Sequence, residues 1–223
     1  MFKIEYKNTG VEFEDHFPDL RKMIRIESSI VMGILNYKKG EINMEFGKCK
    51  ECENGKYVIR NGEYNRFSGC NNYPKCKSTI TIAEYIKRYL EEEGVKIYRW
   101  KKTCPRCKKE TNVISYFLNY ELEKCDEVFE MVGNIGIGDI PFIDKLLMVK
   151  YKNIKLVKSK TINEEYVANI CEHCGCLQGH NYVVDDPHEI WEDLYHEKTM
   201  EKYLYDNINV KGTFIPYKEL NII

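Results

Sequence analysis

Apolar and polar residues alternate in several short stretches of this chain, which is the pattern of half-buried β-strands. The first stretch lies at the N-terminus, where Phe2, Ile4 and Tyr6 are separated by polar residues. Four more stretches have strand-like composition and lie at residues 97–100, 113–118, 155–160 and 166–170. The pattern therefore predicts many short strands.

Helical spacing of apolar residues predicts four helices. The first follows Pro18. The second has the clearest limits, because Thr81 can cap its start, Glu84 fits the capping-box position and Gly94 can end it. Two more helices are expected at about residues 141–151 and 187–203, the last of them acidic.

Length and composition are those of an ordinary globular protein. The chain has 223 residues, 43% of them hydrophobic, and a formal net charge of −1. Its most apolar stretch, residues 135–149, is interrupted by Asp139, Asp144 and Lys145, which argues against a membrane span. The N-terminus lacks the pattern of a secretion signal. We therefore expect a cytoplasmic, reducing location, where Cys-x-x-Cys pairs indicate metal or redox chemistry.

Charge is unevenly distributed along the sequence. Residues 47–79 contain seven basic and three acidic side chains, a net charge of +4. Residues 94–112 contain seven basic side chains and one acidic, a net charge of +6, whereas acidic residues concentrate in residues 164–201. The two basic segments are therefore expected to meet anions.

Eight of the ten cysteines fall into two sets of four, each made of two pairs. The sets are Cys49, Cys52, Cys70 and Cys76, and Cys104, Cys107, Cys171 and Cys174. Four thiolates can hold one Zn²⁺ ion tetrahedrally, and metal binding supplies folding free energy that so small a first segment lacks. We expect two zinc ions in a small α+β protein, with two β-rich zinc ribbons plus flanking helices. The predicted modules are residues 1–46, 47–94 and 95–223.

The first cysteine set is interleaved with aromatic and basic residues. Tyr57, Tyr64, Phe67 and Tyr73 are too many rings for so thin a core, so some should be exposed. Exposed rings among lysines and arginines are typical of a surface on which single-stranded bases stack, at roughly 1–3 kcal/mol per base. The alternative is that these rings merely cover the zinc site.

The string from Cys49 to Cys76 resembles the C-terminal four-cysteine zinc finger of bacterial type IA DNA topoisomerases. The positions that match the signature in order are Phe67, Gly69, Cys70, Tyr73, Pro74 and Cys76. Lys50 stands where the family usually has proline, and Asn65 where it often has glycine. The resemblance implies Cys49, Cys52, Cys70 and Cys76 as zinc ligands and binding of DNA, mainly single strands. It covers these residues alone and does not imply strand passage.

The second cysteine set predicts a zinc ribbon despite the long spacer between its pairs. Residues 159–179 are similar to zinc-ribbon segments of uncharacterised bacterial and phage proteins, which carry no assigned activity. A rival set of ligands would use Cys176, His173 or His180. A redox role for Cys104 and Cys107 is a further alternative. Cys125 is isolated and is expected to be a small buried side chain.

Two other motifs are interpreted as ordinary structure. Residues 133–138 have a glycine-rich pattern that does not match a phosphate-binding loop, and we expect a plain loop there. His16, beside Asp15 and Asp19, is expected to lie on a solvated helix start instead of in a metal or acid–base site.

The leading hypothesis is a zinc-dependent protein without catalytic activity that binds nucleic acid, with single-stranded DNA favoured. The expected contacts are Lys48, Lys56, Arg60, Tyr64, Arg66, Phe67, Tyr73, Lys75 and Lys77 in the first module, and Arg99, Lys101, Lys102 and Lys108 in the second. The alternative is an adaptor that docks a protein partner through the acidic helix near Trp191. No paired carboxylates or nucleophile–base arrangement supports a third possibility, an enzyme.

Overall fold

The computed structural model describes residues 47–63, 66–125, 135–160, 163–179, 183 and 190–220. The chain divides into two units, residues 1–42 and 43–223, and all described residues belong to the second. The predicted N-terminal strand, the helix after Pro18 and the His16 cluster lie outside the described residues, as do Tyr64 and His180.

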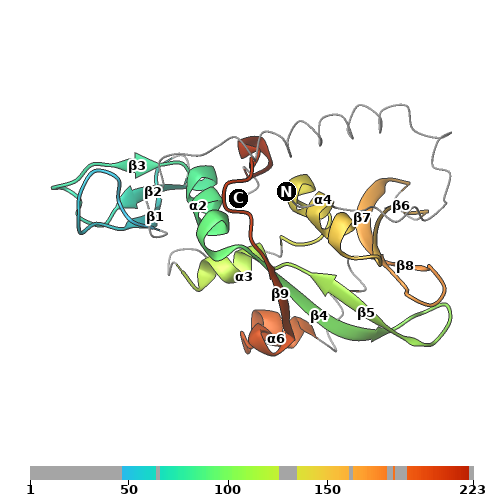
Figure 1. The fold of residues 1–223 in the computed structure, drawn as a ribbon. Coiled ribbons are helices and arrows are strands. Elements are labelled where there is room, and N and C mark those ends of the chain that lie inside the picture. The colour runs from blue at the N-terminus through green and yellow to red at the C-terminus, as the bar shows by residue number, and fades with distance from the viewer. Residues whose placement is uncertain are drawn as a thin grey trace, which may run out of the picture. The chain divides into compact units, whose positions relative to one another are not determined.

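The first cysteine set lies in a small antiparallel sheet of order β1-β2-β3 (Figure 1). Its strands are β1 (Tyr57–Asn61), β2 (Arg66–Cys70) and β3 (Thr79–Ile80). Along β2 the side chains become progressively buried towards Cys70, which pairs with Tyr57 at the start of β1. The end of β2 therefore places Cys70 next to the other three cysteines of the first set.

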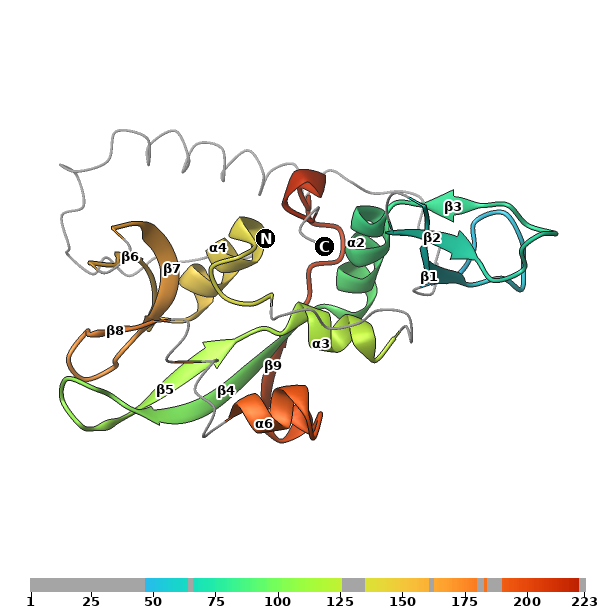
Figure 2. The same ribbon diagram turned by 180° about the vertical axis from the view of Figure 1, so that it is seen from behind.

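Helix α2 (Ile82–Glu93) follows this sheet and agrees with the sequence prediction. The Thr81 hydroxyl accepts from Glu84 N–H at 3.1 Å, and Gly94 ends the helix at a positive φ of 78°. One face of α2 is buried, and Arg88 lies 5.1 Å from the centre of the buried Tyr57 ring of β1. The helix thus connects the first zinc segment to the rest of the described chain (Figure 2).

A second antiparallel sheet has the order β5-β4-β9. It consists of β4 (Val95–Thr103), β5 (Glu110–Ser115) and β9 (Leu204–Ile208). Trp100 and Val113 pair across β4 and β5 and lie in a buried aromatic cluster with Phe117, just before α3 (Leu118–Glu123). The opposite face of β4 carries exposed Arg99 and Lys101. Burial of one face thus sets which basic side chains reach solvent.

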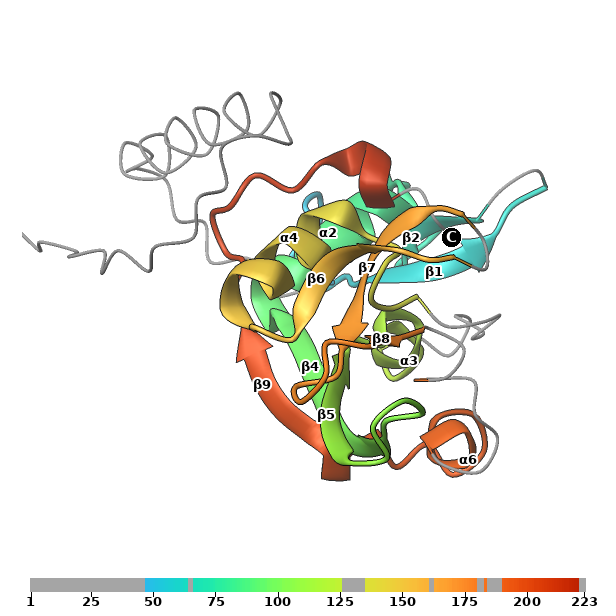
Figure 3. The ribbon, with the colours of Figure 1, turned by 90° about the vertical axis from the view of Figure 1, so that its right-hand side faces the viewer.

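A third antiparallel sheet, of order β6-β7-β8, follows α4 (Pro141–Lys150). Its strands are β6 (Ile154–Lys158), β7 (Glu165–Ile170) and β8 (Leu177–Gln178). The helix runs beside β6 and β7 (Figure 3), and its buried Ile143 and Leu147 belong to the same core cluster as Tyr85 and Ile86 of α2. These elements confirm the predicted α+β class and the predicted strands and helix of this region.

The C-terminal part is less helical than the sequence pattern predicts. Helix α6 spans Ile190–Tyr195, a 3₁₀ turn follows at Met200–Tyr203, and a second such turn lies at Tyr217–Leu220. Lys198 has a positive φ of 51°, and Thr199 N–H donates to the Asp193 carbonyl. This reversal ends the predicted 187–203 helix early. In the described part of the chain, no helix is long and apolar enough to cross a membrane.

Candidate metal centres and nucleic-acid interface

The structure brings the first predicted cysteine set together. Cys49 and Cys52 lie in the turn before β1, Cys70 ends β2, and Cys76 lies in the loop before β3. The Sγ atoms of Cys49 and Cys76 are 3.7 Å apart, those of Cys52 and Cys70 are 3.6 Å apart, and all four lie within 4.8 Å of one another. Zinc with Zn–S distances near 2.3 Å has S···S separations of about 3.8 Å in a tetrahedron. The sulfurs therefore fit a Zn²⁺ ion.

Gly55 leaves the space that this sulfur cluster needs. A Cβ atom built at Gly55 would lie 2.5 Å from the Sγ atoms of both Cys52 and Cys70. Any side chain would thus displace two of the four sulfurs. Gly55 is not among the site residues predicted from the sequence, although Asn54-Gly55 is a turn dipeptide between the first cysteine pair and β1.

Backbone and side-chain amides point at the sulfurs of the first set. Glu51 N–H donates to Cys49 Sγ at 3.4 Å, and Asn72 donates from its backbone to Cys70 and from its side chain to Cys52. Burial opposes ionisation of Cys49, but the amides outweigh it and lower its pKa to about 6. Burial and the neighbouring thiols raise the pKa of Cys70 to about 12. Four thiolates this close therefore require a cation, which zinc would supply.

The second predicted set forms a similar cluster from two facing turns. Cys104 and Cys107 lie between β4 and β5, and Cys171 and Cys174 lie between β7 and β8. The Sγ distances are 3.7 Å for Cys104–Cys174 and 3.7 Å for Cys107–Cys171, with all four sulfurs within 4.8 Å. The geometry fits a second Zn²⁺ ion, which the two pairs would share although they are far apart in sequence.

The two turns of this second cluster have matching backbone hydrogen bonds. Lys108 N–H donates to the Cys104 carbonyl at 2.9 Å, and Gly175 N–H donates to the Cys171 carbonyl at 2.9 Å. Both donors have positive φ, 61° and 65°. Cys104 N–H then donates to the carbonyl of Lys109, as Cys171 N–H does to that of Cys176. Cys176 therefore occupies the position of a non-ligand residue.

Two of the alternative ligands, His173 and Cys176, and the redox interpretation do not fit the geometry, whereas the third alternative ligand, His180, lies outside the described residues. His173 Nε2 is 2.8 Å from the Glu110 carbonyl oxygen, and Cys176 lies outside the sulfur cluster. None of the ten cysteines forms a disulfide, and Cys104 follows the end of β4 and precedes a turn, where a thioredoxin-like site would begin a helix.

Two other expectations have clear outcomes. Cys125 is exposed, so the prediction of a buried side chain is wrong; it lies just beyond the end of α3. Of the glycine-rich loop at residues 133–138 the structure describes residues 135–138, where Gly136 and Gly138 donate their amides to the carboxylates of Asp139 and Asp144. These amides are engaged within the chain, as expected of a plain loop.

A groove of about 330 Å³ lies beside the first cysteine cluster. Its lining includes four of the predicted nucleic-acid contacts, Arg60, Phe67, Tyr73 and Lys77. Tyr73 is 65% exposed, and Phe67 is half-buried. A Cβ atom at Gly69 would lie 3.2 Å from the Phe67 ring and 3.4 Å from Arg60, so glycine leaves room for both side chains along the strand. The groove thus combines rings and cations next to the sulfur cluster.

The remaining predicted contacts of the first module lie around this groove or elsewhere on its surface. Lys48, Lys56 and Lys75 are exposed and Arg66 is half-buried. Tyr57, a member of the aromatic set, is buried, and its hydroxyl lies 2.7 Å from Ser78 Oγ. Tyr57 therefore packs inside the first module, and its ring is not available for stacking on a base.

The predicted contacts of the second module have different surroundings. Arg99, Lys101 and Lys108 are exposed, and Lys101 pairs with Glu110 at 3.1 Å. Lys102 is 2% exposed, because strand alternation puts it on the buried face of β4 that also carries Trp100. A buried ammonium group does not reach a phosphate, so Lys102 is removed from the set of expected contacts.

Comparison with known proteins finds proteins that are similar to the first module. Residues 46–85 match the family model of the topoisomerase DNA-binding C4 zinc finger. DNA topoisomerase 1 of Methanothermobacter thermautotrophicus is 40% identical over 47 residues, which are 21% of this chain and 6% of that protein. DNA topoisomerase 1 of Campylobacter jejuni is 29% identical over 109 residues, 48% of this chain and 14% of that protein. No solved structure matches.

This chain therefore matches a small part of the length of these relatives. The second match is longer than the finger itself and so includes residues beyond the family match. The family match confirms the resemblance seen in the cysteine motif. Together with the two sulfur clusters, it indicates a zinc-binding protein with a DNA-related function.

Proposed function

We propose that the protein binds single-stranded nucleic acid, with DNA favoured, through its first zinc module, and that it has no catalytic activity of its own. Zinc would hold the turns that carry Tyr73 and the end of β2 in place. Phosphates would be met by the basic side chains, and bases would stack on the exposed rings.

The groove beside the first sulfur cluster is the observation that carries this proposal. Its lining combines Phe67 and Tyr73 with Arg60 and Lys77, which come from β1, β2 and the loop between β2 and β3. Arg60 also donates to the Cys70 carbonyl at 3.3 Å, which fixes its direction relative to a predicted zinc ligand. Binding of single-stranded nucleic acid without sequence preference uses this combination of ring faces and cations. Sequence-specific recognition of base edges would need a larger set of amide and carboxylate groups.

The test is fluorescence anisotropy of the zinc-loaded protein with a labelled oligothymidylate, titrated with salt. Tyr73→Ala should weaken binding by roughly 5- to 150-fold, since each stacked base contributes about 1–3 kcal/mol. Phe214→Ala is the matched control, because Phe214 is 74% exposed and lies outside the groove. Zinc content must be equal in all variants.

Duplex DNA and single-stranded RNA of the same length provide the comparison of substrates. Single-stranded DNA should bind tightest, and its affinity should fall steeply with salt because counterions are released from the phosphates. Failure of the zinc-loaded protein to bind the oligothymidylate at low salt would refute the proposal. Co-purification of one defined protein partner together with that failure would favour the adaptor hypothesis instead.

A further inference from the structure

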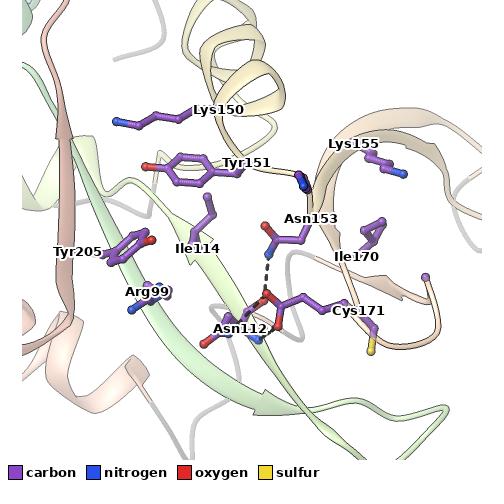
Figure 4. A pocket seen from close by; sticks show the side chains of 13 residues that line it. Arg99, Asn112, Ile114, Lys150, Tyr151, Asn153, Lys155, Ile170, Cys171 and Tyr205 are labelled. Carbon is purple, nitrogen blue, oxygen red and sulfur yellow. Dashed lines mark hydrogen bonds between the residues drawn. The ribbon is translucent and has the colours of Figure 1, made fainter. Parts of the chain in front are cut away.

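A second groove, of about 550 Å³, lies on the second zinc module and is not explained by the finger. It is lined by β4, β5 and β9 on one side and by the end of α4 and the β6–β7 pair on the other (Figure 4). Its lining includes Arg99, Tyr151, Lys152, Lys155 and Tyr205. Of these, Arg99 alone is among the nucleic-acid contacts predicted from the sequence.

A β-bulge builds a stacking platform on one wall of this groove. Ile97 pairs with Asp206 and Tyr98 with Leu204, so Tyr205 is the extra residue of β9. The bulge places the Tyr205 ring under Arg99, whose guanidinium carbon lies 3.5 Å from the ring centre. Arg99 is exposed and Tyr205 is 45% exposed, so the stacked guanidinium has a face available to solvent. Nucleic-acid bases stack on such guanidinium planes.

The opposite wall supplies positive charge. Lys150 pairs with Asp206 at 2.6 Å, and the Asp206 carboxylate also accepts from the Tyr151 hydroxyl. Lys152 and Lys155 are exposed and have no ion pair with any residue in the described part of the chain. The acidic member of the lining, Glu172, is held by hydrogen bonds from Asn112 at 3.2 Å and 3.1 Å. Arg99, Lys152 and Lys155 thus remain as cations for an anionic ligand.

We propose that this second groove binds another stretch of the same single-stranded nucleic acid, with a base stacked on Arg99 and phosphates held by Lys152 and Lys155. The inference rests on the proposed function, because it extends the binding surface from the finger to the second zinc module. The protein would then contact one strand at two separate sites.

Photocrosslinking with an iodouracil-substituted oligothymidylate tests each site separately. Peptide mapping should find one adduct on the peptide that carries Tyr73 and another on a peptide that carries Tyr151 or Tyr205. A groove adduct without a finger adduct would refute the proposed function and leave the second groove standing. A finger adduct without a groove adduct would overturn the second groove and leave the proposed function intact.

The variant Lys152→Ala/Lys155→Ala changes exposed side chains and should not disturb folding. It should remove the groove adduct, keep the finger adduct, and lower the salt slope of oligothymidylate binding by about 1 to 1.5, since each phosphate contact on a single strand contributes about 0.7. Lys211→Ala, an exposed lysine outside the groove, is the matched control and should change nothing. An unchanged slope in the double variant, or thymidine monophosphate binding as tightly as the strand, would overturn the inference.

Discussion

At the scale of single residues, the folded structure constrains Gly55 and Asp144 through the atoms that surround them. Gly55 must lack a side chain, because the sulfurs of Cys52 and Cys70 occupy the space that a Cβ atom would take. Asp144 is buried at the start of α4, where its carboxylate accepts from Gly138 N–H at 3.1 Å. Neither constraint can be seen from the identity of the residue.

Gly55→Ala should weaken zinc binding at the first cysteine set. Moving two sulfurs away from a Cβ atom at 2.5 Å is an overpacking change, which typically costs roughly 1–3 kcal/mol, or about 5- to 150-fold in zinc affinity. Competition with a chromogenic zinc chelator measures this loss. Gly179→Ala is the control, since its Cβ atom would meet the Tyr166 hydroxyl at an ordinary 3.7 Å. Equal affinities in both variants would contradict the argument.

Asp144 should make stability fall as pH rises. Burial raises its pKa from the ordinary 3.8 to about 7. The native state therefore binds more protons than the unfolded state between these values, and its contribution to stability is lost as pH rises towards 7. From about pH 5.5 to about pH 8, Asp144→Asn should gain about 2 kcal/mol relative to the wild type.

Urea unfolding across this pH range measures the difference between the two proteins, in which effects of pH on the zinc sites cancel. Glu164→Gln, which changes an exposed carboxylate, should follow the wild-type profile. Parallel profiles for the wild type and Asp144→Asn would show that the burial of Asp144 does not control its ionisation.

At the scale of elements, one amide side chain fastens the third sheet to the second. Asn169 of β7 accepts from Ile114 N–H and donates to the Ile114 carbonyl of β5, both at 2.8 Å. It thus provides both hydrogen bonds that a neighbouring strand would provide, and it is 1% exposed. The clamp holds Cys171, two residues further on, opposite the turn that carries Cys104 and Cys107.

Asn169→Ala should lower the free energy of unfolding by roughly 3 kcal/mol, because it leaves the buried Ile114 N–H and carbonyl without partners. It should also weaken zinc binding at the second cysteine set, since the two turns would lose their alignment. Asn153→Ala removes a single hydrogen bond, to the Asn112 carbonyl, and should cost about 1 kcal/mol. Chemical denaturation and zinc competition measure both effects. A cost for Asn169→Ala no larger than for Asn153→Ala would contradict the clamp.

Elements with local signals were predictable from the sequence, whereas those set by long-range pairing were not. Thr81 and Gly94 fix both ends of α2 through their own backbone geometry. The cysteine sets were recognisable from the sequence because closely spaced Cys-x-x-Cys pairs have few roles other than binding a metal ion. The burial of Lys102 depends on which face of β4 packs against Phe117, and the Tyr205 platform depends on a bulge between distant strands. Such features follow from register, which neighbouring residues in the sequence do not determine.

At the scale of the whole described chain, the two zinc modules share a core but not their ligands. Buried side chains of one cluster extend from Tyr57 and Ile59 of the finger through α2 to Ile143 of α4. The four sulfurs of each cluster, in contrast, come from one module alone. Zinc at one site should therefore be lost without loss of zinc at the other, while the shared core transmits part of the destabilisation.

Single cysteine substitutions separate these two contributions. Cys76→Ser and Cys174→Ser should each leave about one zinc ion per chain, because the thiolates of each site supply its binding free energy, on the order of 10–16 kcal/mol for structural zinc. Both tryptophans of the chain, Trp100 and Trp191, lie in the second module, so their fluorescence reports on it alone. Cys76→Ser should keep the wild-type spectrum and lose oligothymidylate binding at the finger, whereas Cys174→Ser should shift the spectrum. Loss of both zinc ions in Cys76→Ser would instead mean that the common core makes the two modules a single cooperative unit.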